Sequence, residues 1–361
     1  MSGKTTLKDI ADEVGVSISA VSRVLNGGTG RISDEKRKRI LSVAERLHYM
    51  PNQVARSLVT GRSKIFGLVV PSIRSRTYTA LIDSLEEMCR VKSYGLFIVN
   101  TNDRPDMEVE GVRMLVERGV DAIFLVPSNR ASETNELRDC LKSLPIPCVT
   151  VVRYLTNLDC DRTYFDNELG GYLGTKHLIE NGHKRIAFAC DTALSNTGRA
   201  RLRGYLKAME EAELPIERGL IIDTEYKMTS GYEAGRILLN RGANAIFAGS
   251  DYIALGMRKA YAEAGLRVPE DLSIVAFDYS ESDFLQAPSM TAMIQDMNVL
   301  AYQALSIVSQ RLAGEGPAKP IEIVLPPELL MGGSVANLWG KTRQASGGIE
   351  SAPMDLSESC E

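Results

Sequence analysis

Apolar residues at helical spacing dominate the first fifty positions of the chain. From Leu7 to Val14 they recur at i, i+3, i+4 and i+7, which predicts one amphipathic helix. Thr6 and Asp9 have the spacing of a capping box at its start. Ser17 and Ser33 are suitable N-caps for two further short helices. The expected inward residues of these two helices are Val21, Val24, Leu25, Ile40, Val43, Ala44 and Leu47.

The pattern changes after Lys64, where short apolar runs alternate with amphipathic helices. Near-continuous apolar strands between such helices predict parallel sheets that are covered on both faces. Two successive cycles predict two doubly wound lobes, with a ligand bound in the crevice outside the carboxyl ends of the strands. The expected strands are 65–70, 96–99, 122–126, 148–152, 185–189, 220–223, 245–248 and 273–277.

Composition narrows the class of protein. The 361 residues are 44% hydrophobic and 24% charged, which is ordinary for a globular chain. No apolar run reaches the ~18 residues that span a bilayer, and residues 1–7 do not resemble a signal peptide. Six cysteines without CxxC pairs indicate reduced thiols. We therefore expect a cytoplasmic protein with no membrane segment.

Charge is distributed unevenly along the chain. Residues 1–62 carry eleven Lys and Arg against six Asp and Glu, whereas the remainder carries 31 basic and 40 acidic residues. A basic segment on an acidic body is typical of a polyanion-binding head. A solvated basic face would give the same count, so charge alone leaves both interpretations open.

Catalytic motifs are missing from the sequence. It contains no HExxH, GxSxG, P-loop or GxGxxG pattern, and its three histidines lack metal-ligand spacing. Gly170, Gly171 and Gly174 do not have the dinucleotide-binding spacing, so we expect them to permit close packing. These observations predict no catalytic residues, no metal and no cofactor, and hence no enzyme.

The head carries a specific motif. Residues 7–26 read LKDIADEVGVSISAVSRVLN, two short helices about a Gly-Val turn. This segment closely resembles the helix-turn-helix head of the lactose-repressor/galactose-repressor (LacI/GalR) family, and the resemblance covers roughly residues 4–335. The matching residues are Thr6 to Ala11, Gly15 to Ser17, Val21 to Asn26, Tyr49, Pro51, Asn52, Ala55 to Leu58, and Gly67 to Pro71.

The resemblance implies an all-α helix-turn-helix N-terminal domain and an α/β two-lobed body like a periplasmic binding protein, with doubly wound parallel sheets. The implied domains are 1–50 for DNA binding, 51–62 for a hinge helix and linker, and 63–340 for effector binding and dimerisation, with the chain crossing between lobes near 163 and 295. Residues 341–361 are rich in Ser, Gly and Glu, and are expected to be disordered. They lack leucine heptads, so we expect a homodimer.

The helix-turn-helix pattern predicts how the head contacts DNA. A recognition helix brings its N-terminal residues to the base edges. Ile18 and Ser19 are therefore expected at the bases, with Ile18 against a thymine methyl group. Arg23, one turn further on, is expected to hydrogen-bond a guanine or to bind a phosphate. The alternative is that it is only a solvated charge. Expected phosphate contacts are Thr6, Ser17, Ser22 and Asn26.

The resemblance also implies a hinge helix from Asn52 to Leu58 that pairs with its dimer mate in the minor groove. Leu58 would wedge into the central base step with Ala55 beside it. The alternative is a linker leucine that packs on the core. The loop from Asn26 to Ser33 is one residue longer than usual in the family, which puts its backbone contacts in doubt.

Strand-end residues supply the expected effector site. Carboxylates and guanidinium groups bind hydroxyls in bidentate fashion, and an aromatic ring covers the apolar face of a sugar. The alternatives are helix-capping roles for Asp166 and Asp278, a surface ion pair for Arg201, and a core position for Tyr226. By resemblance, the effector contacts are Tyr78, Arg153, Asp166, Arg201, Tyr226, Ser250, Asp278 and Gln295.

Arg74 and Arg76 bear on the charge of the effector. Near the mouth of a cleft they would favour an anionic ligand such as a sugar phosphate or sugar acid. Solvated arginines, or arginines facing DNA or the dimer mate, are equally consistent with the sequence.

The expected function is sequence-specific transcription regulation, chiefly repression, with double-stranded, pseudo-palindromic operator DNA and a small polar effector as partners. A solute-binding protein would share the body but needs a signal peptide and no DNA-binding head. A sugar-modifying enzyme would need a nucleophile and base that the sequence does not offer.

Overall fold

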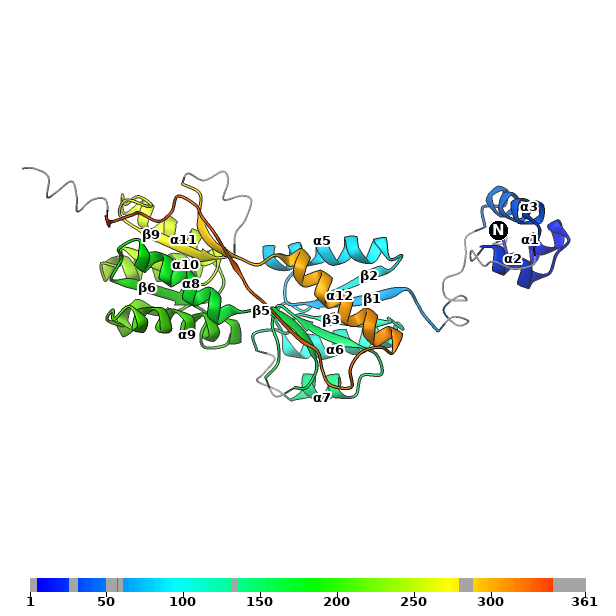
Figure 1. Cartoon of the computed structure of the whole chain (residues 1–361), viewed down its shortest axis with the longest axis horizontal. Helices are drawn as coiled ribbons and strands as arrows, with labels where there is room; N and C mark the ends of the chain where they lie inside the picture. Colours follow the sequence, from blue (N-terminus) through cyan, green and yellow to red (C-terminus); the bar gives the residue numbers. More distant parts are fainter. Residues whose placement is uncertain are drawn as a thin grey trace, which may run out of the picture. The chain divides into compact units, whose positions relative to one another are not determined.

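The computed structural model describes residues 5–25, 32–49, 57, 61–130, 135–156, 158–278 and 288–339. They form two compact units that divide between Ser63 and Lys64. The first contains the N-terminal helices, and the second contains two α/β lobes (Figure 1).

The first unit is built from α1 (Leu7–Val14), α2 (Ile18–Leu25) and α3 (Asp34–Arg46). The predicted capping box is confirmed, because Thr6 and Asp9 exchange side-chain and backbone hydrogen bonds at the start of α1. Gly15 ends this helix with φ of 73°, a left-handed conformation in which glycine is unstrained. The shared core is formed by Ile10, Ala11, Val14, Val21, Val24, Ile40, Val43 and Ala44.

The first lobe is a six-stranded parallel sheet in the order β11-β5-β4-β3-β1-β2. Phe66, Leu68 and Val70 of β1 face one core, and Val69 faces another, because successive side chains of a strand point to opposite faces. Its elements are β1 (Ile65–Val70), α5 (Arg76–Val91), β2 (Gly95–Asn100), α6 (Pro105–Glu117), β3 (Ala122–Leu125), α7 (Glu136–Lys142), β4 (Cys148–Val151), β5 (Asp161–Phe165), α12 (Met297–Ala313) and β11 (Glu322–Leu325).

The second lobe has the sheet order β12-β10-β9-β8-β6-β7, parallel except for the antiparallel pair β10 and β12. The prediction of parallel sheets thus holds for all but one edge pair. Its elements are α8 (Asn167–Glu180), β6 (Ile186–Cys190), α9 (Asn196–Glu211), β7 (Ile221–Asp223), α10 (Met228–Asn240), β8 (Ala245–Ala248), α11 (Asp251–Glu263), β9 (Ser273–Phe277), β10 (Thr291–Ile294) and β12 (Glu328–Leu330).

The chain passes between the lobes three times. It leaves the first lobe between β5 and α8, returns between β10 and α12, and crosses again between β11 and β12. Figure 1 shows α12, in orange, among the elements of the first lobe. The sequence did not predict the third crossing. It also did not predict helix α12 or the strands β5, β10, β11 and β12.

Close helix packing in the second lobe depends on small residues, as the sequence predicted. A Cβ on Gly171 would lie 2.1 Å from the carbonyl oxygen of Arg201, and a Cβ on Gly204 would lie 2.0 Å from that of Glu168. Only glycine therefore lets α8 and α9 approach to this distance. None of the helices in the described part of the chain has both the length and the apolar character needed to cross a bilayer.

Candidate functional site

The N-terminal turn of α2 forms an exposed ridge on the first unit. Ile18 is 48% exposed although it is a large apolar residue, and Ser19 and Arg23 are also exposed. The opposite face of the helix is packed, with Val21 and Val24 buried in the core. An exposed apolar side chain flanked by polar ones, at the start of a helix, can contact both the bases and the phosphates of DNA.

Two predicted phosphate contacts already have structural roles. Thr6 caps α1, and Ser17 accepts a hydrogen bond from the backbone N–H of Ala20 (3.2 Å) at the start of α2. Ser22 is half-buried on α2. Predicted contacts from Asn26, Asn52, Ala55 and Leu58, and the predicted tail 341–361, lie outside the described residues.

The carboxyl ends of the two sheets face each other across polar side chains. Asn129, after β3, donates from its amide to Asp191, after β6 (3.2 Å). Thr77 donates from its hydroxyl to Asp278, which follows β9 (3.1 Å). The amide of Asn196 donates to a main-chain oxygen of the first lobe (2.7 Å). These contacts bridge the lobes at the strand ends, which is where the fold predicts a ligand-binding cleft.

Arg153 lies on the first-lobe side of this cleft and is 9% exposed. Its guanidinium is 3.7 Å from the carboxylate of Asp103, donates to the carbonyl of Pro127 (3.3 Å) and lies 5.6 Å from the ring centroid of Tyr78. Burial raises the pKa of the Tyr78 hydroxyl, an effect that Arg153 opposes. The arginine therefore sits buried between an aromatic ring and a carboxylate.

In the second lobe, Arg201 of α9 is also buried, at 5% exposure. Its Nε donates to Asn167 (2.8 Å), one terminal nitrogen donates to the carbonyl of Gly249, and the guanidinium carbon lies 3.4 Å from the ring centroid of Phe277. These contacts do not make a surface ion pair, so that alternative is wrong. They fix a buried cation whose two acceptors, the Asn167 amide oxygen and the Gly249 carbonyl, are both neutral.

Asp278 and Gln295 are brought together as a pair. Gln295 donates to Asp278 through its amide (2.6 Å), while Thr77 reaches the other carboxylate oxygen from the first lobe. Asp278 adopts φ of 66°, an uncommon conformation for a residue with a side chain and one associated with functional sites.

The remaining predicted effector residues have local partners. Tyr226 donates from its hydroxyl to Ser195 (3.3 Å), and burial raises its pKa. Asp166 accepts from the backbone of Leu169 (2.9 Å) as the N-cap of α8, and Ser250 caps α11. Asp166 therefore has the helix-capping role that the sequence left open.

Arg76 bridges the lobes. It donates to Asp251 (3.3 Å), and its guanidinium carbon lies 5.4 Å from the ring centroid of Tyr252. The hydroxyl of Tyr252 in turn donates to the carbonyl of Arg74 (3.2 Å). Arg76 thus has a carboxylate partner at the cleft mouth, which removes one reason to expect an anionic ligand.

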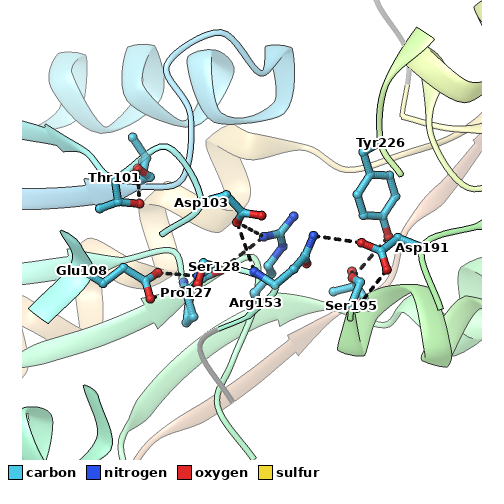
Figure 2. A network of polar contacts seen from close by, with 12 residues as sticks. Thr101, Asp103, Glu108, Pro127, Ser128, Arg153, Asp191, Ser195 and Tyr226 are labelled. Carbon is cyan, nitrogen blue, oxygen red and sulfur yellow. Dashed lines mark hydrogen bonds and ion pairs between the residues drawn. The ribbon is translucent and has the colours of Figure 1, made fainter. Parts of the chain in front are cut away.

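Several cleft residues escaped the sequence analysis, namely Asp103, Glu108, Asn129 and Asp191. Asp191 directly follows β6, and Asn129 follows β3 by a few residues, so the rule that strand ends carry the site could have found them. Figure 2 shows how the side chains around Arg153 and Asp191 converge. Burial raises the pKa of Asp191.

Two hollows lie beside α7 in the first lobe. The one of about 190 Å³ is lined by Cys148 and Asp161, which begin their strands, and the one of about 520 Å³ is lined by the C-terminal end of α6 and by α7. They are therefore at the amino ends of the strands, away from the cleft. Among the described residues, no group of three His, Cys, Asp or Glu could hold a metal ion.

Comparison with known proteins agrees with this architecture. Residues 6–52 match the family model described as bacterial regulatory proteins, lacI family, and residues 175–335 match a periplasmic binding protein-like domain. The transcriptional repressor PurR of Haemophilus influenzae (strain PittEE) is 34% identical over 337 residues, covering 92% of this chain and 99% of PurR. The transcriptional regulator DegA of Bacillus subtilis is 33% identical and covers 93% and 99%.

Solved structures give the same fold. The lac repressor dimer bound to operator matches with a TM-score of 0.82 at 23% identity, covering 92% of this chain and all of that one. The complex of the transcriptional regulator CelR with cellobiose matches with a TM-score of 0.69 at 26% identity, covering 91% and 99%.

The helix-turn-helix unit and the two-lobed body thus define a DNA-binding transcription regulator with an effector-binding domain, not an enzyme. The chain belongs to the LacI family.

Proposed function

We propose that the chain is a repressor that binds a pseudo-palindromic operator as a homodimer and responds to a small polyhydroxy effector held between its lobes. Two observations carry this proposal: the exposed ridge on α2, and the buried arginine that each lobe holds, Arg153 in the first and Arg201 in the second. Relatives named as transcriptional repressors support the regulatory sign. Such a regulator acts on DNA in the cytoplasm.

Residues at the start of α2 recognise the DNA sequence. Ile18 contacts a thymine methyl group, Ser19 hydrogen-bonds a neighbouring base, and Arg23 binds a guanine or a phosphate. The support is the exposure of all three side chains on one short helix. Hinge residues Asn52, Ala55 and Leu58 complete the interface in the minor groove, as the family resemblance implies.

The effector contacts in this proposal are the buried or half-buried groups of the cleft. Arg153 has Asp103 beside it and Arg76 has Asp251, so each of these two arginines has a balancing carboxylate, whereas Arg201 donates to neutral acceptors. A neutral ligand rich in hydroxyls fits this mixture of carboxylates and guanidinium groups better than an anion does. The cellobiose bound by CelR supports the same ligand class.

Homodimerisation is supported by the edge of the first sheet. On edge strand β2, Phe97 and Ile98 are each 44% exposed, and Val91 at the end of α5 is 78% exposed. Exposed apolar residues on an edge strand are costly in a monomer, and a second copy would cover them. Sedimentation of an Ile98→Arg variant tests this, because the dimer should dissociate while the fold remains.

Effector and operator are linked through closure of the lobes. A ligand shifts operator affinity only by its different affinity for the open and closed states. Lobe closure is expected to change the separation of the two hinge helices of the dimer. These helices pair in the minor groove only at one separation, so closure alters operator affinity.

Operator binding tests the head. Operator duplexes are first selected from genomic fragments with the full chain. Ile18→Ala should then weaken binding to the selected operator by about tenfold, while binding to random duplex falls much less. Leu41→Ala is the matched control, because Leu41 is 47% exposed on α3 outside the ridge. Equal losses on both duplexes would reject base reading by Ile18.

Ligand response tests the cleft. A thermal-shift screen of sugars, sugar phosphates, sugar acids and nucleobases identifies ligands through the stabilisation they produce. Arg201→Ala should retain operator binding and lose the response to the ligand found. Arg203→Ala is the control, because Arg203 is exposed on the same helix and pairs with Glu168. A normal response in the Arg201 variant would reject the assignment.

A further inference from the structure

Glu108 is a buried carboxylate that the proposed effector contacts do not use. It lies in the first turn of α6 and is 0% exposed. Both of its oxygens are engaged by Ser128, one by the backbone N–H and the other by the hydroxyl (3.1 Å). A buried carboxylate survives only with such partners, so the contact fixes the turn that follows β3.

The residue after Ser128 contacts the second lobe. Asn129 donates from its backbone N–H to Asp103 (3.1 Å) and from its side-chain amide to Asp191 (3.2 Å). Figure 2 shows this row of polar groups running from Glu108 through Ser128 to Asp191. The amide oxygen of Asn129 is buried without a hydrogen-bond partner, so the geometry of this side chain is set by its donors alone.

Asp191 carries the connection into the second lobe. It accepts hydrogen bonds from the backbone N–H groups of Leu194 (3.0 Å) and Ser195 (3.3 Å). Ser195 is the N-cap of α9, the helix that carries Arg201. A displacement of the 127–129 turn therefore reaches the element that holds a buried cleft arginine.

We propose that Glu108 is a positioning residue for lobe closure: its ionised carboxylate sets the Ser128–Asn129 turn so that Asn129 meets Asp191. Closure of the cleft then depends on whether Glu108 is charged. The inference rests on the proposed function of the cleft only where closure is said to control operator binding.

The electrostatic surroundings bring the pKa of Glu108 close to neutral pH. Burial raises its pKa to about 7, the hydrogen bonds from Ser128 oppose this rise, Asp103 adds to it and Arg153 reduces it. Protonation converts one acceptor oxygen into a donor and weakens a charge-assisted pair of hydrogen bonds. Asp191, on the opposite lobe, also has a raised pKa, so both ends of the connection weaken as the pH falls.

Hydrogen exchange of the full chain, without DNA or ligand, tests the connection. Glu108→Ala should raise exchange about tenfold at 127–129 and also at 191–195, which Glu108 does not touch. Asn129→Ala should raise exchange at 191–195 equally, and the double variant should add nothing further. Glu110→Ala, an exposed change on the same helix, should alter neither segment. A change confined to 127–129 would overturn the proposal.

The pH profile distinguishes positioning from simple structural support. In the unsubstituted protein, protection of 191–195 should fall as the pH is lowered through about 7, after correction for intrinsic exchange, because opening of the lobe contact leaves Glu108 buried and loses only the hydrogen bonds that its charge strengthens. Global unfolding exposes Glu108 to water and therefore has the opposite pH dependence. Glu108→Gln keeps an acceptor for Ser128 without a charge, so its profile should lack the part of the pH dependence that Glu108 contributes near neutrality. A profile unchanged by Glu108→Gln would overturn the proposal, even if Glu108→Ala does not fold.

These measurements separate the inference from the proposed function. Exchange at 191–195 depends on lobe contacts alone, whereas operator affinity depends on the head and its control. Coupled exchange with no ligand effect on operator binding would contradict the proposed function and leave the role of Glu108 in place. If Glu108→Ala leaves exchange at 191–195 unchanged while the ligand still alters operator binding, the role of Glu108 would be contradicted and the proposed function would remain in place.

Discussion

Replacing Glu108 by glutamine should make the protein more stable at alkaline pH and change little at acidic pH. Glu108 has a pKa of about 7 in the folded protein and an ordinary value of 4.5 when unfolded. The folded state therefore binds the proton more tightly, so stability falls as the pH rises from 4.5 through 7. Glutamine does not ionise, so the variant does not lose this part of its free energy of unfolding as the pH rises.

The size of the effect follows from the two pKa values. A separation of about 2.5 pKa units corresponds to about 3 kcal/mol at pH well above 7, at about 1.4 kcal/mol per unit. At about pH 5 most of this difference is absent, because the folded protein is protonated and the unfolded chain only partly ionised. The advantage of glutamine should therefore grow by about 2.5 kcal/mol between about pH 5 and about pH 8.5. Glu108 is 0% exposed, so solvent screening does not reduce this figure much.

Urea unfolding of the full chain, followed by circular dichroism at the two pH values, measures this difference. Glu110→Gln is the matched control, because Glu110 is exposed on the same helix and should show no pH-dependent gain. A constant difference between Glu108→Gln and the unsubstituted protein at both pH values would refute the argument from burial.

Three further changes test the packing. Gly204→Ala should lower the melting temperature strongly, because the new Cβ would lie 2.0 Å from a backbone oxygen, whereas Gly219→Ala, with its nearest atom at 3.9 Å, should not. Asp161→Ala should cost about 3 kcal/mol in urea unfolding, because it leaves Arg311, now bound at 2.6 and 2.7 Å, without its carboxylate; an unchanged midpoint would contradict this. Thr6→Ala should destabilise the head by about 1 kcal/mol in thermal unfolding, and an intact head transition would show that the capping box contributes nothing.

The fold could be predicted where apolar periodicity is strong. Buried strands such as β1 and β8 read as continuous apolar runs because helices cover both faces of the sheet. Strand β5 was missed because only alternate residues are buried and its sequence is Asp-Arg-Thr-Tyr-Phe. Helix α12 has apolar residues on most of its surface, so it shows no amphipathic stripe.

The cleft could be predicted in part. The resemblance pointed to Arg153 and Arg201, and both are buried, Arg153 just after β4 and Arg201 on α9. Glu108 gave no such signal, because an acidic residue in the first turn of a helix is ordinary. Asn129 offered only its place in the loop after β3, where an asparagine is common. Only the tertiary fold brings α6 beside the loop after β3, so their partnership is visible only in three dimensions.

Linkage between operator and effector tests the central claim most directly. The affinity of the full chain for a selected operator duplex is titrated with and without the sugar found in the ligand screen, and the affinity for the sugar is titrated with and without operator. If lobe closure couples the two sites, each partner should change the affinity for the other by the same factor, as thermodynamic reciprocity requires. A sugar that binds between the lobes and leaves operator affinity unchanged would contradict it.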